Sequence, residues 1–161
     1  MSKKDPISIA IELFQKAYEY QMKGEFDLAI EHYKRSIEAY PTAEAHTFLG
    51  WTYSFQGKLD EAIAECKKAI EVDPDFGNPY NDIGAYLIEL ERYDEAIPWL
   101  ERAIQAKRYE PRHYPHYNLG RVYLIKGMIK KALEEFQKAL EVYPDYTLAK
   151  EAIDKVKFTL N

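Results

Sequence analysis

The stretch DEAIAECKKAIEVDPDFGNPYNDIG, residues 60–84, contains the pattern that predicts the fold. Its first part carries apolar residues at helical spacing and ends at a proline, and a second helical pattern begins after it. Related stretches follow, DEAIPWLERAI at 94–104 and KALEEFQKALEVYPDY at 131–146. A repeated unit therefore extends over most of the chain.

Three columns of small residues give the period of this unit. The columns are Ala17, Gly50, Gly84 and Gly120; Ala29, Ala62, Ala96 and Ala132; and Ser36, Ala69, Ala103 and Ala139. All three show the same intervals of 33, 34 and 36 residues. A small side chain lets two crossing helices approach closely, so each unit is predicted to be a helical hairpin. A hairpin cannot bury its own apolar face, so the units must stack.

Turn and capping residues set the expected helix ends. A short polar break divides each unit, at Gly24, Gly57, LERYD (90–94) and Gly127. Asp27, Asp60 and Asp94 are predicted N-caps of second helices, and Lys130 takes that place in the fourth unit. Asp5-Pro6 predicts the first helix start, and Pro41, Pro74 and Pro144 are predicted to end second helices.

Composition narrows the class of protein. The 161 residues carry a net charge of −5, which disfavours nucleic acid and anionic membranes as partners. Cys66 is the single cysteine, so an intramolecular disulfide and a CxxC site are excluded, and burial in the second helix is its expected state. No apolar run is long enough to span a membrane, and the first residues do not resemble a signal peptide. We expect a soluble, cytoplasmic protein without a membrane partner.

The columns resemble those of the tetratricopeptide repeat, a 34-residue helical hairpin. The resemblance covers residues 10–146 and implies a single all-α domain over 1–161, a right-handed superhelical solenoid of antiparallel hairpins. The expected repeats are about 10–42, 43–76, 77–112 and 113–146, followed by a capping helix at 147–160 whose apolar stripe is Leu148, Ala152, Val156 and Leu160, with Ala149 and Ile153 beside it. The tryptophan usual near the start of each repeat is absent; Leu13, His46, Tyr80 and His116 stand there.

The resemblance also implies a concave groove, lined by first helices, that binds peptides or partner proteins without catalysis and without a cofactor or metal. The register places these candidate partner-binding residues along it: Phe14, Tyr18, Trp51, Phe55, Asn78, Asn81, Asp82, Tyr114, Tyr117, Asn118 and Arg121. Exposed aromatic side chains are typical of interfaces, and asparagine amides pair with peptide backbones. Any one of these aromatic residues could instead pack between adjacent hairpins, and a second copy of the chain could fill the groove as a self-assembling scaffold.

One subclass of the family holds a chaperone's C-terminal carboxylate with lysine, arginine and asparagine on first helices. In either possible frame those positions fall mostly on aromatic or acidic residues, among them Tyr18, Trp51 and Asp82. We therefore expect no chaperone-type carboxylate clamp.

The stretch RYEPRHYPHYN, residues 108–118, is interpreted as a lengthened joint between the third and fourth units. Pro111 and Pro115 fit a helix stop and a first turn. His113 and His116 share a helical face but lack the further ligands that zinc requires. Arg108 and Arg112 beside tyrosines also fit a single-stranded nucleic-acid platform, a weaker alternative, or contacts with an acidic partner.

No catalytic motif stands in the chain, so we expect no enzyme activity. Four glutamates lie at helical spacing from basic residues and are predicted to form solvated ion pairs on the outer face, with His32 exposed beside them. These glutamates are Glu31, Glu65, Glu134 and Glu135, and the basic residues are Lys34, Arg35, Lys68 and Lys138.

Overall fold

Nine α-helices make up most of residues 4–160, the part of the chain that this computed structural model describes. They are α1 (Pro6–Met22), α2 (Phe26–Ala39), α3 (Ala43–Phe55), α4 (Leu59–Val72), α5 (Asn78–Glu89), α6 (Tyr93–Gln105), α7 (His113–Ile125), α8 (Ile129–Val142) and α9 (Thr147–Leu160). Within residues 4–160, β-structure is limited to one isolated bridge between Phe76 and Arg108.

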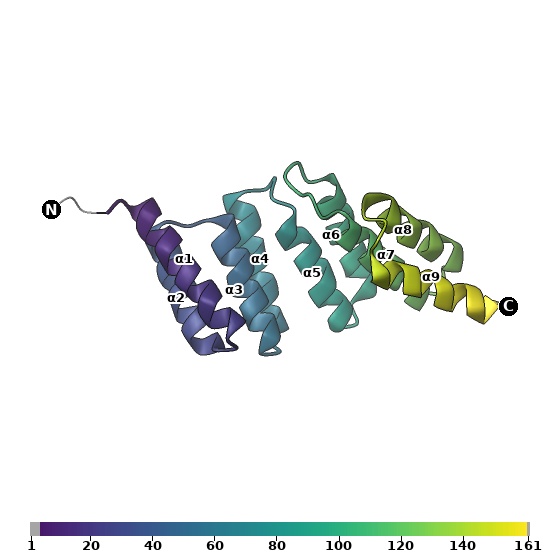
Figure 1. Cartoon of the computed structure of the whole chain (residues 1–161), viewed down its shortest axis with the longest axis horizontal. Coiled ribbons are helices and arrows are strands. Elements are labelled where there is room, and N and C mark those ends of the chain that lie inside the picture. The colour runs from purple at the N-terminus through teal and green to yellow at the C-terminus, as the bar shows by residue number, and fades with distance from the viewer. Residues whose placement is uncertain (1–3, 161) are drawn as a thin grey trace.

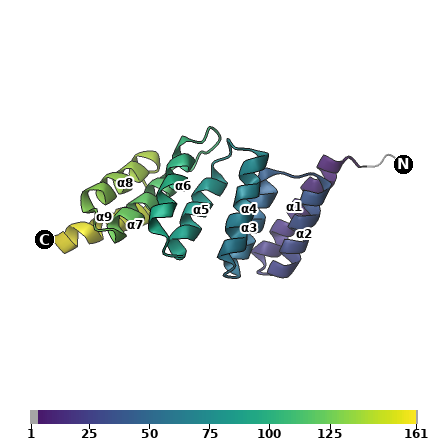
Figure 2. The ribbon, with the colours of Figure 1, turned by 180° about the vertical axis from the view of Figure 1, so that it is seen from behind.

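The helices pack in sequence order as four hairpins, α1–α2, α3–α4, α5–α6 and α7–α8, with α9 against the last. Figure 1 shows the hairpins side by side along the long axis, with α1 and α9 at opposite ends of the molecule, and Figure 2 shows the same order from behind. The first helices of neighbouring hairpins also contact one another, α3 with α5 and α5 with α7. The predicted all-α solenoid is therefore confirmed, and α1, α3, α5 and α7 form what we call the first-helix face.

Helix ends follow the predicted signals in part. Asp5 caps α1 by accepting a hydrogen bond from the Ser8 amide at 2.8 Å, and Pro6 is the first helical residue. The prolines at 41, 74 and 144 each follow the C-cap residue of a second helix, where their rings prevent the helix from continuing. Thr42, which was not predicted, caps α3 by accepting from the Ala45 amide at 3.1 Å.

The predicted aspartate N-caps are wrong. The cap positions of α2, α4 and α6 are Glu25, Lys58 and Arg92, and none of them makes a side-chain capping bond. The aspartates at 27, 60 and 94 lie inside the first turn, where a carboxylate still interacts favourably with the helix dipole. Two of them reach the next hairpin: Asp27 accepts a hydrogen bond from Gln56 at 3.1 Å, and Asp94 pairs with Lys126.

The turns inside the hairpins require a left-handed backbone. Gly24, Gly57 and Gly127 have φ values of 76°, 75° and 77°. In the third hairpin the equivalent residue is Glu91, with φ 61°, the only non-glycine residue with positive φ within residues 4–160. A side chain in this conformation is strained, so Glu91 marks a local weakness in an otherwise regular turn.

The small-residue columns sit where helices cross. Ala17, Ala29 and Ala62 are completely buried. At Gly120 a Cβ atom would lie 2.4 Å from Cε1 of Phe136, a large residue of the facing helix. The tight crossing therefore depends on a missing side chain. Cys66 is buried at the equivalent place in the second hairpin, as predicted, and burial raises the pKa of its thiol well above its ordinary value.

Helix α9 covers the end of the array with a stripe that agrees with the predicted one only in part. Its buried residues are Ala149, Ile153 and Val156, whereas Leu148 and Leu160 are exposed. The predicted stripe followed an i, i+4 spacing throughout, and it drifts around a helix of 3.6 residues per turn. The i, i+4, i+7 spacing of the observed stripe keeps its members on one side.

The joint between the third and fourth hairpins folds back onto the loop between α4 and α5. Gly77 donates its amide to the carbonyl of Arg108 at 3.1 Å, and the Arg108 amide donates to the carbonyl of Asp75 at 2.9 Å. Tyr109 is buried against Gly77. A Cβ atom added to Gly77 would lie 2.4 Å from the Cβ atom of Tyr109. The lengthened joint thus contacts the loop between α4 and α5, and the two loops adjoin in Figure 1.

Candidate protein-interaction surface

Aromatic side chains of α1 and α3 form a continuous group on the first-helix face. Phe48 lies at its centre, with ring centroids 5.2 Å from Phe14, 5.9 Å from Tyr18 and 5.8 Å from Trp51. Trp51 continues the group to Phe55 at 5.0 Å. We call these five residues the aromatic row. Edge-to-face contacts of this kind fix ring orientations, so the row is a rigid surface.

The row has an exposed and a covered part. Tyr18 and Phe55 keep 42% and 52% of their surface exposed, and Trp51 is partly buried. Phe14 is also partly buried and contacts Tyr33 of the same hairpin at 5.5 Å. Phe14 therefore packs mainly against neighbouring helices, which is close to the alternative of packing between hairpins. Tyr18 and Phe55, in contrast, present ring surface to solvent.

A small cavity lies next to the row, between α3 and α5. It has a volume of about 180 Å³ and is lined by Thr47, Phe48, Trp51, Asn78 and Asp82. Three predicted site residues thus meet here: Trp51, Asn78 and Asp82. Burial raises the pKa of Asp82 to about 7, since an ionised carboxylate is disfavoured where water is partly excluded.

The polar residues of α5 and α7 form a hydrogen-bonded chain. The Asn118 amide donates to the side-chain oxygen of Asn81 at 3.1 Å, and Arg121 donates to the side-chain oxygen of Asn118 at 3.1 Å. Both asparagines are buried, at 8% exposure. The structure brings together these three predicted residues, and it uses part of their hydrogen-bonding capacity within the chain itself.

A second aromatic group lies at the α7 end of the first-helix face. Tyr117 and Tyr114 lie 5.4 Å and 5.9 Å from Tyr146, and His113 lies 4.8 Å from the same ring. Tyr114 is 44% exposed. The sequence reading missed Tyr146, although the PDY that contains it repeats the PDF at 74–76.

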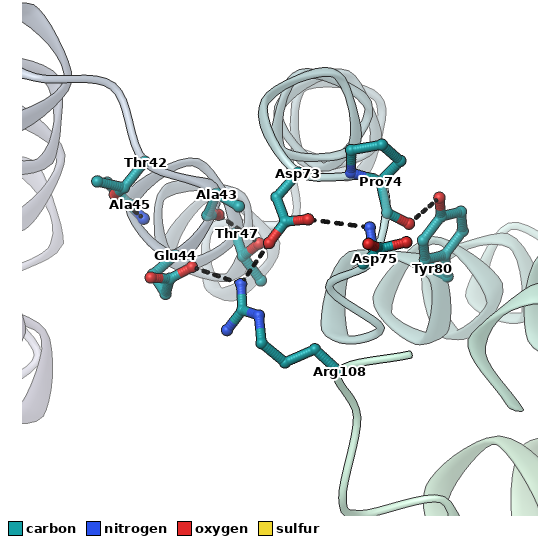
Figure 3. Close-up of polar contacts among 10 residues, drawn as sticks. All are labelled: Thr42, Ala43, Glu44, Ala45, Thr47, Asp73, Pro74, Asp75, Tyr80 and Arg108. Atoms are coloured by element: carbon teal, nitrogen blue, oxygen red, sulfur yellow. Dashed lines mark hydrogen bonds and ion pairs between the residues drawn. The ribbon is translucent and has the colours of Figure 1, made fainter. Parts of the chain in front are cut away.

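Figure 3 shows how the arginine of the joint is used. Arg108 donates to Asp73 at 2.7 Å and to Glu44 at 3.2 Å, and its guanidinium lies 4.3 Å from the ring centroid of Phe76. Arg112 donates to the carbonyls of Ile104 and Ala106 at 2.9 Å and 2.6 Å. The cationic groups predicted for a partner are therefore engaged within the chain.

The two histidines of the joint have separate environments. His113 packs among tyrosines, and His116 lies 2.7 Å from Glu135. Over residues 4–160, no group of three or more His, Cys, Asp or Glu side chains is placed to hold a metal ion.

The prediction of solvated ion pairs holds in full for none of the four glutamates. Glu31 and Glu134 are exposed but form no ion pair within residues 4–160, and Glu65 and Glu135 are paired but mostly buried. Glu65 and Glu135 do pair with Lys68 and Lys138, at 3.1 Å and 3.2 Å, as expected from their spacing. However, their side chains are only 12% and 14% exposed, because each also meets a histidine of the first helix. His32, predicted as exposed, is buried and bonds through Nδ1 to the carbonyl of Leu28 at 2.8 Å.

Family models of the tetratricopeptide repeat match three segments, residues 13–42, 43–76 and 75–145, which together contain α3, α5 and α7 and the second half of α1. The chain belongs to the tetratricopeptide repeat family. As a tetratricopeptide repeat protein, it is a protein–protein interaction module. Members of this family are generally non-catalytic.

Two curated relatives illustrate the similarity. The chain is 39% identical over 93 residues to the Protein SGT1 homolog of Oryza sativa subsp. japonica. The matched residues make up 57% of this chain and 25% of that protein. It is 30% identical over 124 residues to the Type IV pilus assembly protein PilF of Pseudomonas aeruginosa. This match covers 76% of this chain and 49% of that protein. The chain thus spans about half or less of the length of these relatives.

Solved structures agree on the fold. The crystal structure of MamA is 30% identical with a TM-score of 0.74, over 87% of this chain and 81% of that chain. The structure of Pseudomonas aeruginosa PilF superposes with a TM-score of 0.89 at 24% identity, over 96% of this chain and 70% of that chain. Across residues 4–160, each helix is too short or too polar to cross a membrane.

Proposed function

We propose that the first-helix face is a groove that binds an extended segment of a partner protein. The observation that carries this proposal is the aromatic row, whose exposed rings lie beside a cavity lined by both aromatic and polar side chains. Exposed aromatic rings next to a pocket are typical binding sites for a partner protein. The groove is non-catalytic, and it acts by contact alone.

The groove is preformed, which favours binding. Ring contacts hold the aromatic row in place, and the Asn81–Asn118–Arg121 chain holds α5 against α7. A surface that is already ordered loses little conformational entropy when a ligand arrives. Affinity then depends on how well the partner fills the cavity and covers Tyr18 and Phe55.

The partner is a peptide or protein segment that does not rely on a C-terminal carboxylate. In one or other of the two possible frames, Tyr18, Trp51 and Asp82 stand at positions where the chaperone-binding subclass carries its clamp, and an ionised Asp82 would repel a carboxylate. PilF is named for pilus assembly, which supports a role for this chain in assembling proteins with one another. The cytoplasm is the compartment we expect for that role.

Binding of a peptide selected by the wild-type chain from a random peptide library tests the proposal. We expect Tyr18→Ala combined with Trp51→Ala to weaken binding of that peptide by about tenfold or more, because aromatic anchors dominate interface energetics. Phe158→Ala is the matched control, since Phe158 is an aromatic residue of α9 that is 85% exposed outside the groove. Circular dichroism of each variant verifies that the helices remain. Equal affinity of the double variant and the wild type would contradict the groove.

Self-association is a second candidate. Phe158 and Leu160 are 85% and 64% exposed on α9, beside a cavity of about 160 Å³ with Leu124 and Val156 in its wall. A second chain could cover this end of the array. Sedimentation velocity of the pure chain tests this candidate. A monomeric mass at every concentration would exclude the self-assembling scaffold.

Nucleic acid is disfavoured as a partner. Arg108 and Arg112, the arginines of the basic joint, are both bonded within the chain, and the net charge is −5. Titration with single-stranded RNA at two salt concentrations checks this, and we expect no salt-dependent binding.

A further inference from the structure

The cavity between α3 and α5 has one aromatic and one polar wall. Trp51 and Phe48 of α3 form the aromatic wall, with centroids 5.8 Å apart and planes at 80°. Both rings line the cavity. A ring face attracts a cation and also covers the methylene stem of a long side chain.

The polar wall is rich in hydrogen-bond acceptors. Thr47 donates its hydroxyl to the Ala43 carbonyl at 2.7 Å, so its oxygen offers the cavity lone pairs and no proton. Asn78 and Asp82 line the same cavity. Within residues 4–160, the side chain of Asp82 forms neither a hydrogen bond nor an ion pair, and the amide of Asn78 has no side-chain hydrogen bond either. A carboxylate in a partly buried place without a partner is unfavourable unless a donor arrives.

Three arginines of the chain that could neutralise a carboxylate already have acceptors. Arg108 binds Asp73 and Glu44, and Arg121 binds Asn118. Arg112 is held by two backbone carbonyls. The charge of Asp82 is therefore left for a ligand to neutralise. Burial holds the pKa of Asp82 near 7, and a bound cation would lower it by favouring the ionised form.

We propose that this cavity is a subsite for a basic side chain, arginine or lysine, of the bound partner segment, with Asp82 as its ion-pair partner and Trp51 stacked along its stem. The inference rests on the proposed groove and adds its specificity. A guanidinium group fits best, because it donates up to five hydrogen bonds to the acceptors of Asp82, Asn78 and Thr47. An acidic or purely apolar side chain would leave the carboxylate unpaired.

Selection from a random peptide library on the full chain gives the first test. We expect the selected peptides to share a basic residue at a fixed distance from their apolar anchors. The same selection on Asp82→Asn, which preserves shape and removes the charge, should lose that residue while the anchors persist. Asp154→Asn is the matched control, because Asp154 is exposed on α9, away from the cavity, and the same carboxyl group is replaced by an amide.

A thermodynamic cycle on one selected peptide gives the second test. Replacing the basic residue of the peptide by methionine should weaken binding to the wild type and to Asp154→Asn by about tenfold, and to Asp82→Asn by about twofold or less. Selected peptides without a fixed basic residue, or the same loss for all three chains, would overturn the subsite and leave the groove intact. If no peptide binds, or if binding ignores Tyr18→Ala and Trp51→Ala, the groove itself fails and the subsite with it.

Discussion

His46 and Glu65 meet at 2.8 Å across the two helices of the second hairpin, and both side chains are buried. The fourth hairpin repeats the contact with His116 and Glu135 at 2.7 Å. In the third hairpin the equivalent residues are Tyr80 and Trp99, whose rings lie 6.2 Å apart. A basic residue completes each set, as Lys68 and Lys138 bind the glutamates and Arg102 lies 4.8 Å from both rings. In each of these three hairpins, one side chain from each helix and one basic residue form a contact between the two helices.

Acid should weaken the two histidine–glutamate contacts. Burial acts to raise the pKa of Glu65 and of Glu135, but hydrogen bonds from the histidine and the lysine outweigh it and leave each pKa below the ordinary 4.5. Because the folded pKa is depressed, this stability is present above pH 4.5 and is lost as the pH falls through the lower folded value.

Glu65→Gln with Glu135→Gln tests this dependence. At pH 7 we expect urea unfolding to show a loss on the order of 2 kcal/mol in the free energy of unfolding, since two buried charge-assisted contacts are removed. The gap between variant and wild type should narrow below pH 4.5. Exposed Glu31→Gln is the control and should change little. A gap that is constant with pH would contradict the account.

Glu91→Gly should stabilise the protein. Glu91 holds φ at 61°, where the other three turns have glycine. Relief of this strain is worth about 1 kcal/mol, which thermal unfolding can resolve. The reciprocal control is Gly57→Ala, at φ 75°, which we expect to lower stability by a similar amount. Destabilisation by Glu91→Gly would show that the carboxylate has a role of its own there.

The joint should depend more on Gly77 than on Arg108. Arg108 is 54% exposed, so Arg108→Ala should cost about 0.5 kcal/mol despite its contacts with Asp73 and Glu44. Gly77→Ala forces a methyl group into Tyr109 and should cost about 2 kcal/mol or more. Urea unfolding ranks the two, and hydrogen exchange at the Arg108 amide should accelerate in Gly77→Ala. The reverse ranking would mean that the charged contacts hold the joint.

Asp82 should make the free chain less stable at high pH. Its folded pKa of about 7 lies above the ordinary 3.8, so between these values the folded chain binds more protons than the unfolded chain. The free energy of unfolding therefore falls as the pH rises through this window. Asp82→Asn should remove the fall and be more stable at pH 8, on the order of 1 kcal/mol. If the variant is less stable at every pH, Asp82 has a partner inside the fold.

Features set by local spacing were predictable from the sequence. Small residues recurring at one period identify the crossings, and Pro74 and Gly57 mark a helix end and a turn because their backbone preferences are intrinsic. Four members of the aromatic row followed from the same periodicity, since Tyr18 and Trp51 lie on matching helix positions, but Phe48 at its centre was not among the predicted site residues.

Features set by the meeting of distant helices were not predictable. Glu65 has a basic neighbour three residues away, which predicts a solvated pair, but the helix crossing also brings His46 to it from 19 residues away. The contact of Arg108 with Glu44 spans 64 residues and depends on how the joint folds back. Spacing along one helix carries no information about either contact.

The chain's two tryptophans provide the most direct test of the groove. Trp51 belongs to α3 on the first-helix face, and Trp99 belongs to the second helix α6. Titration of a library-selected peptide into the ¹⁵N-labelled chain reports on both through their indole N–H signals. We predict that the Trp51 signal shifts with saturation while the Trp99 signal stays in place. A saturating shift of Trp99 with Trp51 unmoved would contradict a binding groove on the first helices.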